Sequence, residues 1–181
     1  GGLYAAAGDL DGDGKDELII SRADGAQDIR IYKRNGDRFN ITRAFALIKN
    51  AFPDYYDAGC FVAAGDFDGD KTDELAVAQA FGGDVVIYKN TGGKLTQAGR
   101  YPAALGNYRG GVSMAAADFD GDGADELVLA TATGRDEARI FKVINGNYNT
   151  LEQMAKITGV FSSKKEGLFI AAGAFKPMFK R

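Results

Sequence analysis

The stretch GDLDGDGKDELII, Gly8–Ile20, places five carboxylates within nine residues and then turns abruptly apolar. It returns as GDFDGDKTDELAV at residues 65–77 and as ADFDGDGADELVL at residues 117–129. Carboxylates at this density repel one another unless a cation lies among them. We call residues 9–17, 66–74 and 118–126 the acidic loops. The negative charge of each of the three loops must be balanced in the same way.

The charge of the chain is divided between these loops and everything else. The loops hold 15 of the 25 acidic residues and two of the 22 basic ones, so they carry −13 while the rest carries +10. Charge that is this concentrated favours a counter-ion. The basic remainder contains no basic cluster or aromatic platform of the kind that binds nucleic acid, so we expect no nucleic-acid partner.

Composition excludes several classes of site. The chain has 181 residues, of which 45% are hydrophobic, as in ordinary globular proteins. No apolar run approaches the ~20 residues of a membrane-spanning helix. Histidine is absent, which excludes Ser-His-Asp and Cys-His nucleophilic sites and the usual zinc sites. The single cysteine, Cys60, excludes an internal disulfide, and its place in an apolar strand predicts a buried thiol.

The acidic loops recur with the period of a repeat protein. Their first aspartates are Asp9, Asp66 and Asp118, which are 57 and 52 residues apart. A further stretch, GLFIAAGAF at residues 167–175, is similar to GLYAAAGDL at residues 2–10, with Ala174 in place of the aspartate. A period of this length indicates a repeated supersecondary unit.

Each repeat contains four expected strands. A small apolar strand precedes the acidic loop, a second follows it, and a third reads DIRIYK, DVVIYK or EARIFK. A turn with Asn-Gly or Gly-Gly comes next and leads to the fourth strand, expected at residues 38–45, 94–101 and 148–156. Four antiparallel strands per repeat are typical of β-propeller blades. A two-sheet β-sandwich is the alternative, but it does not require the repetition.

We therefore predict an all-β chain of about three propeller blades plus the first strand of a fourth. The expected bounds are 1–57, 58–109 and 110–165 for the blades and 166–181 for the start of the fourth. Because a ring usually has four to eight blades, either the chain is part of a longer propeller or copies of it associate. The up-and-down strand order places all three acidic loops on one face.

The spacing of the carboxylates predicts metal sites. Counted from the first aspartate, carboxylates at positions 1, 3 and 5 turn toward one point, the backbone carbonyl of position 7 can face inward, and the glutamate at position 9 closes the set. Oxygen ligands alone suit a hard cation, Ca²⁺ before Mg²⁺. The predicted ligand residues are Asp9, Asp11, Asp13, Lys15, Glu17, Asp66, Asp68, Asp70, Thr72, Glu74, Asp118, Asp120, Asp122, Ala124 and Glu126.

The start of each acidic loop is also that of an EF-hand. An EF-hand loop, however, ends with a glutamate at position 12 and enters a helix, whereas position 12 here is Ile20, Val77 or Leu129 within an expected strand. Asp and Gly also favour turns without any metal, but three such loops in register argue against turn formation alone. Position 8, which is Asp16, Asp73 or Asp125, is expected to support the loop from outside the ligand set.

The loop sequences DLDGDGKDE, DFDGDKTDE and DFDGDGADE resemble the FG-GAP and VCBS-type repeats of calcium-binding β-propellers, such as the integrin α-subunit head and many secreted bacterial proteins. The resemblance implies two or three structural calcium ions on one face, ligand contacts on the opposite face, and an extracellular, secreted or cell-surface location. Two departures stand out. Lys71 replaces a glycine in the second loop, and Ala174, Lys176 and Pro177 leave the fourth repeat without a metal site.

The opposite face carries connectors with exposed aromatic and polar residues, which suit a glycan or protein ligand. The candidates are Tyr55, Tyr56, Asn107, Tyr108 and Arg109, and the alternative for the aromatic rings is packing between blades. The expected function is a non-catalytic binding module for a glycan or protein. The alternatives are a structural element whose copies associate, and a fragment of a calcium-dependent polysaccharide lyase.

Overall fold

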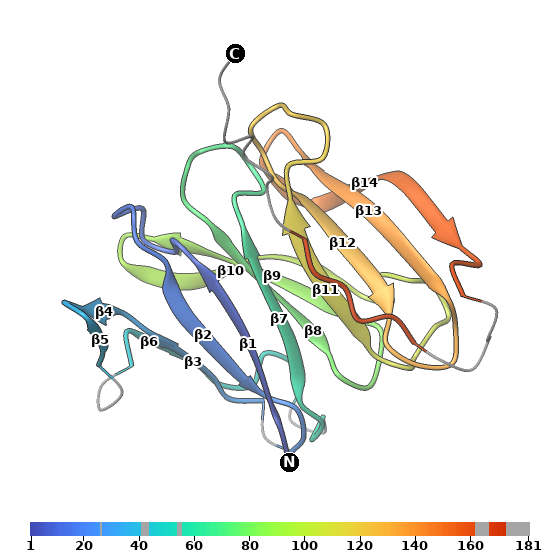
Figure 1. The fold of residues 1–181 in the computed structure, drawn as a ribbon, viewed down its shortest axis with the longest axis horizontal. Helices are drawn as coiled ribbons and strands as arrows, with labels where there is room; N and C mark the ends of the chain where they lie inside the picture. Colours follow the sequence, from blue (N-terminus) through green and yellow to red (C-terminus); the bar gives the residue numbers. More distant parts are fainter. Residues whose placement is uncertain (26, 41–43, 54–55, 162–166, 173–181) are drawn as a thin grey trace.

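In the computed structural model, the described residues are 1–25, 27–40, 44–53, 56–161 and 167–172. They form an all-β fold without helices, built on three four-stranded antiparallel sheets (Figure 1). The first sheet has the order β1-β2-β3-β6, the second β7-β8-β9-β10 and the third β11-β12-β13-β14. Chain order and sheet order coincide, as in propeller blades, and this confirms the predicted fold class.

The strand bounds follow the repeat. The first blade consists of β1 (Leu3–Gly8), β2 (Glu17–Arg22), β3 (Ile29–Tyr32) and β6 (Ala46–Ile48). The second consists of β7 (Cys60–Gly65), β8 (Glu74–Gln79), β9 (Val85–Thr91) and β10 (Lys94–Tyr101). The third consists of β11 (Val112–Ala117), β12 (Glu126–Thr131), β13 (Glu137–Ile144) and β14 (Asn147–Thr158).

The fourth strand of the first blade lies later than predicted. Residues 38–45 were expected to pair with β3, but β5 (Arg38–Phe39) folds back on β4 (Arg34–Asn35) as a small exposed hairpin. The partner of β3 is β6, in which Ile48 is buried opposite Ile29. The local Asn-Gly turn and the burial of a later apolar residue together outweigh the strand pattern of residues 38–45.

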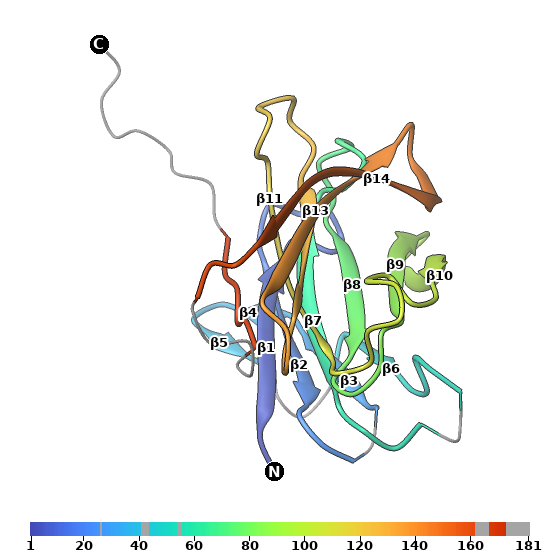
Figure 2. The same cartoon turned by 90° about the vertical axis from the view of Figure 1, so that its right-hand side faces the viewer.

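The first strands of the blades, β1, β7 and β11, lie next to one another at the centre of the molecule (Figures 1 and 2). Their alanine and glycine residues permit this close approach. One apolar core fills the joint between the first and second blades and includes Ile19, Ile31 and Val77. A second core fills the joint between the second and third blades and includes Ala76, Ile87 and Leu129. Burial between blades is thus what joins them.

The outer faces of the first and third blades are more exposed than the joints. Leu3 on β1 is 68% exposed, whereas Cys60 at the equivalent place on β7 is 1% exposed, which confirms the predicted buried thiol. After the third blade, the N–H of Leu168 donates to the carbonyl of Thr131 at 2.7 Å, and the hydroxyl of Ser113 donates to the carbonyl of Leu168 at 2.6 Å. Leu168 thus bonds to β11 and β12, residues 167–172 contain no strand, and the fourth blade stays a prediction.

All three acidic loops project from the same end of the sheets, the upper end in Figure 1, while the N-terminus lies at the lower end. This confirms the predicted placement of the loops on one face. No helix among the described residues is long and apolar enough to cross a membrane.

Candidate metal centres

Each acidic loop folds around its first aspartate. The two carboxylate oxygens of Asp9 accept the N–H groups of Asp13 at 3.0 Å and Gly14 at 2.7 Å. Asp66 and Asp118 accept loop N–H groups in the same way. This wrapping brings positions 1, 3 and 5 together, so that one carboxylate oxygen from each lies within 4.8 Å of the others in all three loops. The predicted triads are therefore real clusters.

The glutamates at position 9 are buried beneath the triads. Glu17, Glu74 and Glu126 are at most 1% exposed. In each, Oε2 accepts the N–H of the loop's second residue, at 3.0, 3.0 and 2.8 Å respectively. Burial, reinforced by the neighbouring Asp11 or Asp68, raises the pKa of Glu17 and of Glu74 to about 7. The other oxygen, Oε1, lies 2.9 Å from the ammonium of Lys89 in Glu74 and 3.3 Å from that of Lys142 in Glu126.

A lysine from the end of the third strand region enters each loop. Lys33 contacts Asp11 and lies 3.0 Å from Asp13. Lys89 lies 2.6 Å from Asp68, 2.9 Å from Asp70 and 2.9 Å from Glu74. Lys142 lies 2.5 Å from Asp120, 2.6 Å from Asp122 and 3.3 Å from Glu126. We call these residues the strand-end lysines.

The strand-end lysines were not predicted as part of the sites. The signal was present, because the motif expected for each third strand, DIRIYK, DVVIYK or EARIFK, ends in lysine, although β9 and β13 continue two residues further. The pairing of β2 with β3 sets Tyr32 opposite Leu18, which brings the next residue, Lys33, beside the end of the loop. Hydrogen bonds and ion pairs with the aspartates raise the pKa of Lys33 and of Lys142, so both remain charged.

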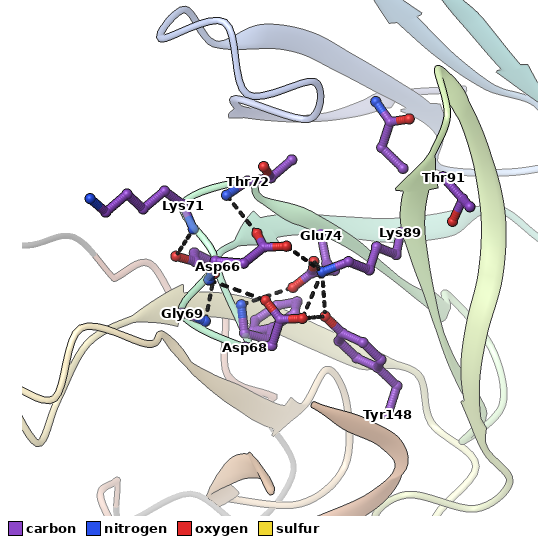
Figure 3. Close-up of polar contacts among 12 residues, drawn as sticks. Asp66, Asp68, Gly69, Lys71, Thr72, Glu74, Lys89, Thr91 and Tyr148 are labelled. Atoms are coloured by element: carbon purple, nitrogen blue, oxygen red, sulfur yellow. Dashed lines mark hydrogen bonds and ion pairs between the residues drawn. The ribbon is translucent and has the colours of Figure 1, made fainter. Parts of the chain in front are cut away.

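The middle loop has a further partner from the third blade (Figure 3). The hydroxyl of Tyr148, on β14, donates to Asp68 at 2.5 Å, and the Lys89 ammonium donates to the same hydroxyl at 3.1 Å. Burial opposes ionisation of Asp68, but Lys89 and Tyr148 outweigh it and lower the pKa of that carboxyl. The middle site is thus closed by residues of two blades.

Lys71 stands in the middle loop where the other two loops have glycine. It adopts a left-handed φ of 73° at the glycine position, and its N–H donates to Asp66 at 2.8 Å. Figure 3 shows its ammonium directed away from the carboxylates. The cation among them is Lys89 instead.

The aspartates at position 8 link neighbouring blades. The carboxylate of Asp73 accepts the N–H of Asp9 at 2.9 Å, and the N–H of Asp73 donates to the carbonyl of Asp9 at 2.9 Å. Asp125 makes the same pair of bonds with Asp66, at 3.1 and 2.7 Å. A side chain at Gly8 would collide with Asp73, so glycine is required there. Asp73 and Asp125 thus lie outside the triads, as predicted, but they bond to the loop of the preceding blade rather than to their own, and Asp16 is exposed.

The residues present fit a hard divalent cation. The donors are oxygen atoms only, and two of them, Oδ1 of Asp11 and Oε1 of Glu126, are buried without a hydrogen-bond partner. The triads would hold the ion, with Glu17, Glu74 or Glu126 beside it. The participation of the backbone carbonyls of Lys15, Thr72 and Ala124 stays a prediction.

Comparison with known proteins identifies the repeats that carry the acidic loops. The family model described as FG-GAP-like repeat matches residues 9–77 and 66–129. The chain belongs to the FG-GAP-like repeat family. A search of curated proteins returned no significant match.

FG-GAP-like repeats in this chain also resemble solved structures in fold. The structure titled rhamnogalacturonan lyase YesW is 17% identical with a TM-score of 0.56, over 89% of this chain and 35% of that one. The structure titled exotype rhamnogalacturonan lyase YesX is 17% identical with a TM-score of 0.50, over 78% of this chain and 34% of that one. The chain thus spans about a third of the length of these structures, and the likeness concerns the fold.

On the opposite face, two predicted ligand residues join the blades. The hydroxyl of Tyr56 donates to the carbonyl of Gly59 at 2.8 Å and accepts the N–H of Phe81 at 3.1 Å. The hydroxyl of Tyr108 accepts the N–H of Thr133 and donates to the carbonyl of Thr133, and Tyr108 is only 7% exposed. Both tyrosines therefore tie a connector to the next blade.

The remaining ligand candidates are placed as follows. Asn107 and Arg109 are exposed on the same connector. The guanidinium of Arg109 donates to the carbonyls of Gly106 and Tyr108 at 2.9 and 2.8 Å, which orders it at the surface. Tyr55 lies outside the described residues. A ligand role for Asn107 and Arg109 stays a prediction.

Proposed function

We propose that this chain is an extracellular, calcium-stabilised β-propeller module that binds a glycan or a protein and has no catalytic activity of its own. The observation that carries the proposal is the repetition of one oxygen cluster: three aspartate triads on one face, each with its carboxylates within 4.8 Å. Calcium accepts six to eight oxygen ligands in flexible geometry, which suits loops that combine carboxylates with backbone groups better than magnesium does.

Calcium in these loops would act through folding. An ion that binds only the folded state stabilises it by about 2.7 kcal/mol per site at a hundredfold excess over the dissociation constant. It would also remove the repulsion among loop carboxylates, which the strand-end lysines offset only in part. Because Asp9 and Asp66 are bonded to the following blade, an ion that orders their loops would also stabilise the joints.

The test is a calcium titration of the full chain by calorimetry, with thermal unfolding in calcium and in chelator. We expect two or three bound ions and a higher Tm in calcium. A variant with Asp11→Asn, Asp68→Asn and Asp120→Asn should lose the binding, whereas the fully exposed Asp37→Asn control should keep it. A chain that binds no calcium, or whose Tm is the same in calcium and in chelator, would contradict the proposal.

The ligand is tested separately. The two lyase structures make rhamnogalacturonan the first glycan to examine, by affinity electrophoresis of the wild type and of Asn107→Ala and Arg109→Ala. We expect binding that both substitutions weaken. Retention of binding in both variants would place the ligand elsewhere.

A second candidate function is that of one part of a polysaccharide lyase, which the titles of the same two structures favour. Incubation with rhamnogalacturonan distinguishes it from a binding module, because a lyase releases unsaturated products that absorb ultraviolet light. Association of copies, the structural alternative, is tested by sedimentation with and without calcium.

A further inference from the structure

The strand-end lysines give each acidic loop a cation of its own. Lys33, Lys89 and Lys142 occupy the same position in three blades, and each ammonium contacts the carboxylates of positions 3 and 5. Lys89 and Lys142 also lie against the buried glutamate of position 9. Because the contact recurs in all three blades, it is a property of the repeat rather than of one loop.

The oxygens that the lysines contact are those that the loop backbone leaves free. In the first loop, both oxygens of Asp9 and Oδ1 of Asp13 accept loop N–H groups. Lys33 contacts Oδ2 of Asp11 and Oδ2 of Asp13. The third loop repeats this division, because Oδ1 of Asp122 accepts the N–H of Ala124 while its Oδ2 contacts Lys142. A divalent ion at the triad would therefore compete with the ammonium for the Oδ2 atoms of positions 3 and 5, although in the first loop Oδ1 of Asp11 is open to it as well.

We propose that the strand-end lysines are internal competitors of the divalent cation, so that each loop exchanges between a lysine-bound and a metal-bound state. The inference rests on the proposed calcium function and adds how its affinity is set. Without metal, the ammonium offsets the repulsion among the carboxylates. To bind, the ion must displace the ammonium, so each loop binds calcium more weakly than the same loop without its lysine.

The contacts also rank the three loops. Lys89 has the most partners, three carboxylates and the hydroxyl of Tyr148, and its side chain is 24% exposed. Lys142 has three carboxylates and is 18% exposed, so the number of partners rather than burial places it after Lys89. Lys33 has two and is 35% exposed. The first loop should therefore fill at the lowest calcium concentration and the middle loop at the highest.

The direct test removes one lysine at a time. Lys33→Met, Lys89→Met and Lys142→Met are compared with wild type by calcium calorimetry of the full chain, with the exposed Lys94→Met as a matched control. Removing the competing unit charge should raise the calcium affinity of that loop by roughly tenfold or more. The same variants should have a lower Tm in chelator, while Lys94→Met should change neither quantity.

The outcomes separate the two proposals. Calcium affinities equal to or below that of wild type would overturn the competition and leave the calcium function standing. A complete lack of calcium binding in wild type and variants would overturn both.

A second measurement needs no substitution and so does not depend on the folding of a variant. The wild-type chain is acetylated briefly in chelator and in calcium, and the modified lysines are identified by mass spectrometry. We expect calcium to raise the reactivity of Lys33 first, then Lys142, then Lys89, while Lys94 is unaffected. Reactivities that calcium leaves unchanged would show that the ammonium is not displaced and would overturn the inference.

Discussion

The first and middle acidic loops have nearly the same sequence and nearly the same backbone hydrogen bonds, but their surroundings differ. In the first loop, Lys33 contacts two aspartates and stays partly exposed. In the middle loop, Lys89 contacts three carboxylates, and Tyr148 from the next blade completes the cluster. The local sequence thus sets the shape of a loop, whereas neighbouring strands and blades set how firmly its charges are held.

The largest difference is expected at the buried glutamates. Glu74→Ala leaves the N–H of Phe67 unpaired and takes one carboxylate from Lys89, so it should lower the free energy of unfolding by about 3 kcal/mol. Glu17→Ala removes one of two acceptors of the Leu10 N–H, which also donates to the carbonyl of Gly8 at 3.1 Å, and should cost about 1 kcal/mol. Urea unfolding in chelator measures both. Equal losses would show that Lys89 adds nothing to the middle site.

A smaller effect is expected at the aspartates that link the blades. Asp73→Ala and Asp125→Ala each remove the acceptor of a backbone N–H in the preceding loop and should cost about 1–2 kcal/mol. Asp16 is the equivalent residue of the first loop and is exposed, so Asp16→Ala serves as the control and should stay within about 0.5 kcal/mol of wild type. A loss for Asp16→Ala as large as for Asp73→Ala would contradict the role of position 8 in the joints.

Tyr148→Phe tests the feature that only the middle loop has. It removes the hydroxyl that donates to Asp68 and accepts from Lys89, and should cost about 1 kcal/mol. In a double-mutant cycle with Lys89→Met the two losses should not add, because the groups share one network. Additive losses would mean that Tyr148 and Lys89 hold Asp68 independently.

The last comparison is a pH dependence that both loops share. The pKa of Glu17 and of Glu74 is about 7 in the folded chain, above the ordinary value of 4.5. Between these values the folded state binds more protons than the unfolded state, so the free energy of unfolding should fall as pH rises through this window. Thermal unfolding in chelator should show a falling Tm, and Glu17→Gln or Glu74→Gln should each remove part of the fall. A Tm that rises across the window would contradict the shifted pKa values.

Much of this molecule could be predicted because its signals are local and repeated. The triads lie within five residues of sequence, and the blades follow from strand patterns that recur with the loops. The position of β6 was missed because an Asn-Gly turn there closes a separate exposed hairpin. Tyr148 was missed because it lies 80 residues from Asp68 in the chain, and no pattern within the loop encodes such a contact. Lys33, Lys89 and Lys142 were within reach, since they repeat as regularly as the aspartates do.

The bonds that the position-8 aspartates make between blades point the same way along the chain. The aspartate at position 8 of each later blade reaches back to the first aspartate of the blade before it, from Asp73 to Asp9 and from Asp125 to Asp66. A single repeat therefore carries two aspartates that connect it to its neighbours. Its position-8 aspartate bonds to the blade before it, and its first aspartate is bonded by the blade after it. A tandem duplication that inserted another such repeat between two existing blades would recreate a matching contact on either side of the insertion, so an array of this kind can lengthen during evolution without any compensating change in its other members.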